Sequence, residues 1–140
     1  MQFVGAKNPL LIIQNGEARE IKGDMNGINE HHKKSPHIQL TTHDIDLSKP
    51  TTFYLYSDGF QDQFGGEQGR KFMKKRFRHL LIDLAKEEKM QEQKEKLAQT
   101  LDDWMSVTST GITAENQEPN GKQRQVDDIL VMGVKWIPQG

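Results

Sequence analysis

The sequence contains no cysteine among its 140 residues, which excludes a disulfide framework and a thiolate zinc site. It also lacks any apolar run of the ~20 residues that a membrane-spanning helix needs. The N-terminus has no basic region of the signal-peptide kind, and Asn8-Pro9 interrupts its short apolar run. We therefore expect a soluble, cytoplasmic domain.

The chain has almost no net charge, because 19 basic residues stand against 20 acidic ones and leave a balance of -1. This balance gives no overall reason to expect nucleic acid or an anionic membrane as a partner. Hydrophobic residues make up 34% of the chain, which is low for a globular domain but enough for a core. The length suits one compact domain.

The first third of the chain has the pattern of a β-hairpin followed by loops. The apolar run 10–13 is followed by Asn15-Gly16, a strong hairpin signal because both positions tolerate a positive φ. Residues 18–21 would form the returning strand, and 23–36 have the composition of a loop. The loose alternation between residues 37 and 47 predicts one or two edge strands.

The rest of the chain predicts a buried strand, a helical region and a final strand. Residues 53–56 are aromatic and apolar on both faces, which favours a buried strand. Beyond Gly65-Gly66 the apolar residues follow helical spacing, and the pattern leaves open whether one helix or two adjacent helices span 86–89. The two apolar stripes consist of Met73, Phe77, Leu80, Leu81 and Leu84, and of Met90, Leu97, Leu101, Trp104 and Met105. Residues 106–125 are polar and predict a flexible loop. Residues 129–136 predict a central strand, so the order of elements predicts an α+β fold.

Carboxylates lie where two of the predicted strands meet a turn. Asp58 directly follows the aromatic strand, and Asp127 and Asp128 directly precede the final one. If the two strands lie side by side, these carboxylates come together, and a divalent cation would relieve their repulsion. Oxygen ligands favour magnesium, manganese or calcium. The alternative is that they are ordinary turn residues, since Asp-Gly is a common turn dipeptide.

Three segments carry a resemblance to a known family. Residues 53–72, FYLYSDGFQDQFGGEQGRKF, resemble the second metal motif of the SpoIIE-like branch of the metal-dependent serine/threonine protein phosphatases (PPM). Residues 125–135, QVDDILVMGVK, are similar to the family's closing motif, and residues 4–13, VGAKNPLLII, to its Ala-Gly-His-Asn-Pro hairpin segment. The three occur in the family's order. The resemblance implies that residues 1–140 are the C-terminal portion of one such domain, a layered antiparallel β-sheet sandwich with packed helices whose N-terminal part is missing.

The resemblance also implies a metal site that holds two divalent cations, Mn²⁺ or Mg²⁺. Asp58 matches a metal-ligating aspartate of the family, with Gly59 as its partner in the metal-site turn. Asp127 matches the metal-ligating aspartate of the closing pair, and Asp128 occupies the second, supporting position of that pair. Asp62 matches an acidic residue that would support the site without contacting the metal.

The sequence departs from the family pattern in ways that bear on activity. The family's first aspartate bridges both metals and lies N-terminal to the hairpin, in a segment that this chain does not include. Asp24, in Gly23-Asp24, mimics that motif but follows the hairpin, so we interpret it as a loop residue. Ser48-Lys49-Pro50 replaces the usual Gly-Asp before the aromatic strand, and Lys7 replaces a histidine. We therefore expect the fragment alone to be inactive.

The function implied by the resemblance is hydrolysis of phosphoserine or phosphothreonine on a phosphorylated regulatory protein, in bacterial-type signalling, by metal-activated water. Domains of this family commonly follow a sensor region, so we expect an N-terminal sensor in a parent protein, and whether that parent is membrane-anchored is left open. Because the first aspartate is absent, a non-catalytic interaction module that retains the phosphatase fold is the alternative.

A third hypothesis is nucleic-acid binding by a basic cluster in the first predicted helix. Its members are Arg70, Lys71, Lys74, Lys75, Arg76 and Arg78. No aromatic stacking platform or nucleic-acid motif accompanies the cluster, so a solvated helix face is favoured and no nucleic-acid partner is expected. The histidines show no ligand spacing, and Trp104 and Trp136 are interpreted as core residues.

Overall fold

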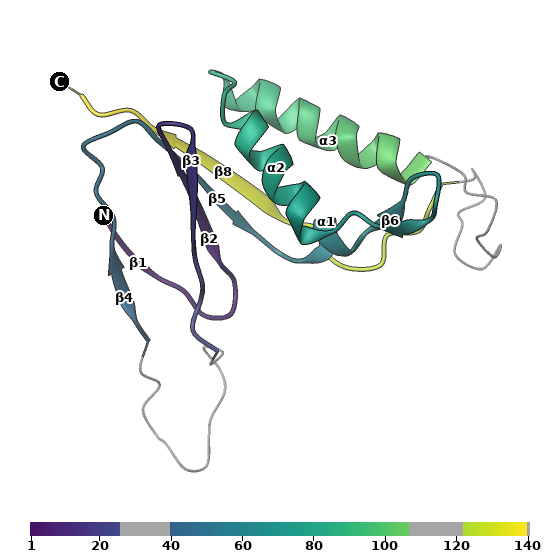
Figure 1. Ribbon diagram of the computed structural model, residues 1–140, viewed down its shortest axis with the longest axis horizontal. Coiled ribbons are helices and arrows are strands. Elements are labelled where there is room, and N and C mark those ends of the chain that lie inside the picture. The colour runs from purple at the N-terminus through teal and green to yellow at the C-terminus, as the bar shows by residue number, and fades with distance from the viewer. Residues whose placement is uncertain (26–39, 107–121, 140) are drawn as a thin grey trace, which may run out of the picture. The chain divides into compact units, whose positions relative to one another are not determined.

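The computed structural model describes residues 1–25, 40–106 and 122–139. The chain divides into two compact units: Met1–Tyr56 with Val131–Gly140, and Ser57–Leu130. Strands come first, then a helical region that includes a short hairpin, then a final strand, in line with the α+β prediction (Figure 1). Among the described helices, none combines the length and the apolar character needed to cross a membrane.

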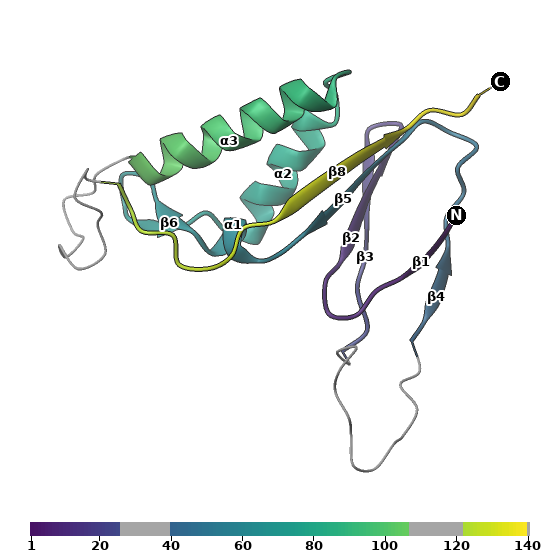
Figure 2. The same cartoon turned by 180° about the vertical axis from the view of Figure 1, so that it is seen from behind.

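The first unit is built on a four-stranded antiparallel sheet with the strand order β3-β2-β5-β8. These strands are β2 (Leu10–Gln14), β3 (Glu17–Ile21), β5 (Thr51–Tyr56) and β8 (Val131–Trp136). The predicted hairpin is confirmed, and its turn has φ of 51° at Asn15 and 79° at Gly16. In both opposite views β5 runs beside β8 (Figures 1 and 2).

A two-stranded sheet covers part of one face of the four-stranded sheet. It pairs β1 (Gln2–Val4) with β4 (Thr42–Asp44), which confirms an edge strand between residues 37 and 47. Phe3 packs against a cluster of buried apolar side chains, together with Leu47. The buried members of the cluster are Leu10, Ile12, Ile21, Ile45 and Phe53. This cluster supplies the hydrophobic stabilisation on that face of the sheet.

The prediction that residues 129–136 form a central strand is wrong for the described part of the chain. There β8 lies at the end of the sheet order and has β5 as its neighbour. Its side chains alternate, so Met132, Val134 and Trp136 are 51%, 50% and 43% exposed. Leu55 of β5 pairs with Met132 and is 37% exposed on the same face. An apolar run on both faces does not by itself show that both faces are covered. The prediction that Trp136 is a core residue is therefore wrong for the described part of the chain.

The second unit consists of a helical pair and a short hairpin. Its elements are α1 (Gly59–Asp62), β6 (Phe64–Gly65), β7 (Arg70–Lys71), α2 (Lys74–Leu84) and α3 (Met90–Ser106). The sequence left open whether one helix or two span residues 86–89, and the structure has two separate helices there, α2 and α3. They lie next to one another in both views (Figures 1 and 2). The predicted loop 106–125 overlaps the end of α3, and residues 107–121 lie outside the described part.

Aromatic packing forms the centre of the second unit. The ring of Phe60 stacks on Phe77 at 4.7 Å between centroids and meets Phe72 edge-on at 5.1 Å. Leu81 and Leu84 of α2 are also buried, as the apolar stripe predicted. Met73 is an exception, because it precedes the helix with φ of 77° and its side chain is 59% exposed.

Substitutions in one row of the sheet test the contrast between its covered and exposed parts. Ile12, Phe53 and Val134 lie in register, but Ile12 is 2% exposed and Val134 is half exposed. We expect Ile12→Ala to lower the free energy of unfolding by about 2–4 kcal/mol and Val134→Ala by about 1 kcal/mol or less. Urea unfolding followed by circular dichroism measures both. Equal losses would contradict the assignment of β8 to an exposed position.

Candidate metal site

The antiparallel pairing of β5 and β8 brings the two aspartate-bearing turns together. Tyr56 and Val131 form the last pair of the ladder. The pairing continues one step further, where the Ser57 amide donates to the Leu130 carbonyl oxygen at 3.0 Å. The two strands therefore lie side by side, as the metal hypothesis requires, and the residues that follow and precede them become neighbours.

The side chain of Ser57 fastens the two turns. Its Oγ donates to the Asp128 carbonyl oxygen at 2.7 Å and accepts from the Leu130 amide at 2.9 Å. At Gly59 an added Cβ would lie 2.3 Å from the Asp128 carbonyl oxygen. Only glycine fits there, because the two backbones are in direct contact. Sequence reasoning assigned Gly59 to the metal-site turn, and the close approach to Asp128 gives that glycine a structural reason.

The carboxylates on these turns are exposed to solvent. Asp58 lies at the start of α1, where its side chain makes no capping hydrogen bond. Asp127 accepts the Asp128 amide at Oδ1, 2.7 Å away. Within the described residues no hydrogen bond or ion pair engages the side chain of Asp58 or Asp128. The structure thus places three aspartates on two touching turns and leaves two of their carboxylates without a protein partner in the described chain.

Asp62 lies one helical turn after Asp58 and is engaged elsewhere. Its carboxylate forms an ion pair of 3.1 Å with Lys71 on β7, and both side chains are about two-fifths exposed. Its amide donates to the Asp58 carbonyl oxygen at 3.0 Å. The predicted supporting role of Asp62 in a metal site stays a prediction, and its observed contact links α1 to the β6–β7 hairpin.

Gln63 is the residue that sequence reasoning missed. Its side chain is completely buried, and Nε2 donates to the Arg124 carbonyl oxygen at 2.8 Å. Oε1 accepts from the Val126 amide at 3.3 Å. The amide of Gln63 thereby holds the segment that leads into Asp127, immediately after the turn that carries Asp58. The only signal in the sequence is a glutamine between Asp62 and Phe64, which is too common a setting to indicate this role.

The backbone of Gln63 also contributes hydrogen bonds to this junction, the place where the end of α3, the β6–β7 hairpin and the segment before Asp127 meet. Its carbonyl oxygen accepts from the Trp104 indole at 3.0 Å and from the Phe72 amide at 2.9 Å. The backbone N–H of Gln123, which is also buried, donates to the Met105 carbonyl oxygen at 2.9 Å. The end of α3, the hairpin and the segment before Asp127 therefore meet around one buried glutamine.

The donor chemistry of the turns fits a hard divalent cation, but the described residues supply only part of a site. Carboxylate and carbonyl oxygens suit magnesium or manganese, and magnesium is commonly held by one or two carboxylates plus waters. Among the residues that the structure describes, no group of three or more histidine, cysteine or acidic side chains could hold a metal. His43 and His79 belong to no such group, and His31, His32 and His37 fall outside the described ranges.

Asp24 has a local structural role, in line with its interpretation as a loop residue. Its carboxylate accepts the Thr41 amide at 2.6 Å and the Thr41 hydroxyl at 3.0 Å. These two hydrogen bonds lower the pKa of Asp24 below its usual value. Its backbone bridges to Ala6, so the residue fastens the segment that follows β3 to the one that follows β1.

Comparison with known proteins identifies the fold. No protein-family model matches the sequence, and no curated protein matches it. Among solved structures, the chain is similar to the SiaA-PP2C domain of Pseudomonas aeruginosa, with 30% sequence identity and a TM-score of 0.70. The match covers 97% of this chain and 46% of that one, so the chain spans less than half of the domain it resembles.

The class of protein follows from this match together with the antiparallel sheets and packed helices. The chain has the fold of a PP2C-type, or PPM-type, phosphatase domain over the part that it covers, and the predicted fold class is confirmed. The likeness extends through both aspartate-bearing turns, because it takes in nearly the whole chain.

Replacing Gln63 by methionine tests whether its amide holds the junction. Methionine has a similar volume but cannot donate to Arg124 or accept from Val126, so we expect a loss of about 2–4 kcal/mol in the free energy of unfolding. Gln99→Met is the matched control, because Gln99 is exposed on α3 and its side chain bonds to the equally exposed Asp103. It should change stability by about 0.5 kcal/mol or less. Similar values for the two variants in chemical denaturation would exclude the proposed role.

Proposed function

We propose that this chain is part of a metal-dependent phosphoserine/phosphothreonine protein phosphatase of the SpoIIE-like kind. The single observation that carries the proposal is the contact between the Asp58–Gly59 turn and Asp128, in a chain with the fold of a PP2C-type domain. The exposed carboxylates of Asp58, Asp127 and Asp128 lie on these two touching turns, where carboxylate oxygens are suitable ligands for a hard divalent cation.

In this proposal the chain's own residues position the metal ligands. Asp58 and Asp127 would bind divalent cations directly, and Asp128 and Asp62 would support them. Ser57 and Gly59 hold the two turns at a fixed separation, and Gln63 fixes the approach to Asp127. Manganese or magnesium, when bound, would lower the pKa of water and neutralise the phosphoryl oxygens during hydrolysis.

The described residues provide too few ligands for a closed two-metal site, so in this proposal the remainder comes from a preceding segment of a parent protein. That segment would carry the family's first aspartate and follow a sensor region. The substrate would be a phosphorylated regulatory protein in a cytoplasmic signalling step. The alternative function, a non-catalytic module with the phosphatase fold, is favoured by the same shortage of ligands.

Metal binding and phosphatase activity separate the two functions. Manganese binding to the chain is measured by isothermal titration, and activity on a phosphoserine peptide is measured with the chain extended by its preceding segment. We expect Asp58→Asn and Asp127→Asn each to weaken manganese binding at least about tenfold and to abolish hydrolysis.

Asp46→Asn is the matched control, because Asp46 is an exposed aspartate of the first unit whose carboxylate bonds to Ser48, whereas both turns belong to the second unit. It should leave manganese binding and hydrolysis unchanged. Manganese binding that is indifferent to Asp58 and Asp127, in an extended chain that is folded but inactive, would support the non-catalytic module instead.

A further inference from the structure

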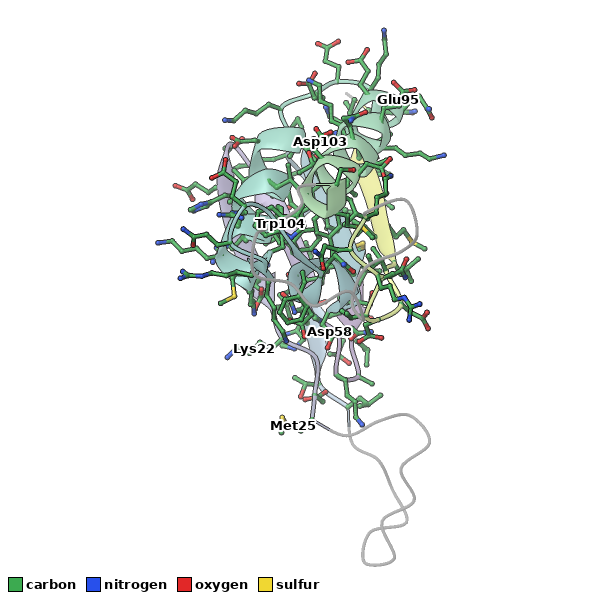
Figure 3. All side chains as sticks on the ribbon, turned by 90° about the vertical axis from the view of Figure 1, so that its right-hand side faces the viewer. Lys22, Met25, Asp58, Glu95, Asp103 and Trp104 are labelled. Carbon is green, nitrogen blue, oxygen red and sulfur yellow. The ribbon has the colours of Figure 1, made fainter. Side chains whose placement is uncertain are left out.

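A groove of about 1060 Å³ opens in the second unit, between the β6–β7 hairpin, the start of α2 and the end of α3. Trp104 and Asp103, near the end of α3, line it, and Figure 3 labels both. None of Asp58, Asp127 and Asp128 lines it, so the groove is distinct from the candidate metal site.

The aromatic rings that line the groove contact one another and the side chain of Arg76. The guanidinium carbon of Arg76 lies 4.6 Å from the centroid of the Trp104 ring and 5.4 Å from that of Phe72. Phe72 meets Trp104 edge-on at 5.2 Å. An added Cβ on Gly66 would lie 2.5 Å from a carbon of the Trp104 ring. These rings therefore form a fixed wall that holds Arg76 in place, rather than an open stacking platform.

Positive charge predominates around this wall. The groove is lined by five residues that can carry a positive charge and by two acidic residues, Glu67 and Asp103. The five are Arg70, Lys71, Lys75, Arg76 and His79. Asp62 pairs with Lys71, but no described residue forms an ion pair with Arg70 or Lys75. The groove therefore presents cations whose charge the described chain does not balance.

The start of α2 makes this charge costly for the folded chain alone. The first turn holds Lys74, Lys75 and Arg76 and no acidic residue, and no side chain caps it. Cations at the positive end of a helix are unfavourable, and an anion there is favourable. Met73, at the same point, exposes 59% of an apolar side chain and has a positive φ of 77°. An ordinary solvated helix face would not be expected to combine an uncapped, basic first turn with an exposed apolar side chain.

We propose that the groove binds an acidic polypeptide segment that carries an apolar side chain. The carboxylates of the segment would pair with Arg70, Lys75 and Arg76, and its apolar side chain would cover Met73. This site goes beyond the proposed phosphatase function, because it requires neither a metal nor hydrolysis.

A nucleic acid fits the same groove less well. The Arg76 guanidinium already lies over the Trp104 ring and Phe72 meets that ring edge-on, so a base would have to compete with these contacts to stack there. Glu67 and Asp103 would also face the phosphates. An acidic peptide can place its carboxylates selectively against the cations, whereas a phosphate backbone carries charge at every step.

Fluorescence of Trp104 reports binding directly. The chain has two tryptophans, so a Trp136→Phe background leaves Trp104 as the sole emitter. The probe is a short Glu/Asp-rich peptide with one central leucine, titrated at low and at physiological salt. Comparison probes are the same peptide with glycine for leucine, a Lys/Arg-rich peptide with the leucine, and single-stranded oligothymidine.

We expect saturable, salt-sensitive binding of the acidic leucine peptide, weaker binding of its glycine version, and no binding of the basic peptide. Arg70→Glu combined with Lys75→Glu should weaken binding about tenfold or more, because two attractive charges become repulsive. Lys94→Glu, an exposed charge reversal on α3 outside the groove, should leave it unchanged. Absence of binding, indifference to the double variant, or tighter binding of the oligonucleotide would overturn the proposal.

Discussion

The buried amide of Gln63 is the interaction on which the arrangement of the second unit depends. A primary amide in an apolar interior is stable only if its donors and acceptors are satisfied, and here the partners are main-chain groups of Arg124 and Val126. These partners come from a part of the chain more than sixty residues away. Because hydrogen bonds are directional, the contact fixes that segment more tightly than apolar packing alone would. The segment leads straight into Asp127, so this buried side chain acts together with the Ser57 hydrogen bonds to position the candidate site.

Structural and chemical roles are divided between neighbouring residues. Phe60, Gln63 and Ser57 take up the packing and the hydrogen bonds around the two turns. The adjacent Asp58 and Asp128 are left exposed, without protein partners in the described chain. Exposed, unpaired carboxylates add little stability, and under the proposed function they would serve to bind a cation. In the proposal for the groove, an acidic peptide would play the corresponding part for the cations at the start of α2.

The features that could be predicted from the sequence are those set by local chemistry. Asn15-Gly16 defines its hairpin, because few other pairs tolerate two successive positive φ angles. The aspartate-bearing turns were found because each follows or precedes a strand with a clear apolar pattern. Apart from the pairing of β5 with β8, which the metal hypothesis required, long-range relations were not predictable. Nothing local distinguishes Gln63 from a surface glutamine, and the apolar pattern of β8 does not show which of its faces is covered. Met73 fitted the helical spacing of α2, but a positive φ placed it outside the helix.

The central claim is that the turn after β5 and the turn before β8 form one cation-binding surface. Paramagnetic broadening by Mn²⁺ in the amide NMR spectrum of the chain tests it most directly, because it detects even weak binding and reports proximity residue by residue. The account predicts that the amides of Asp58 and Gly59 and those of Asp127 to Ile129 broaden together, at the lowest manganese concentration that affects any resonance. Broadening of one turn without the other, or first broadening at acidic residues elsewhere in the chain, would contradict it.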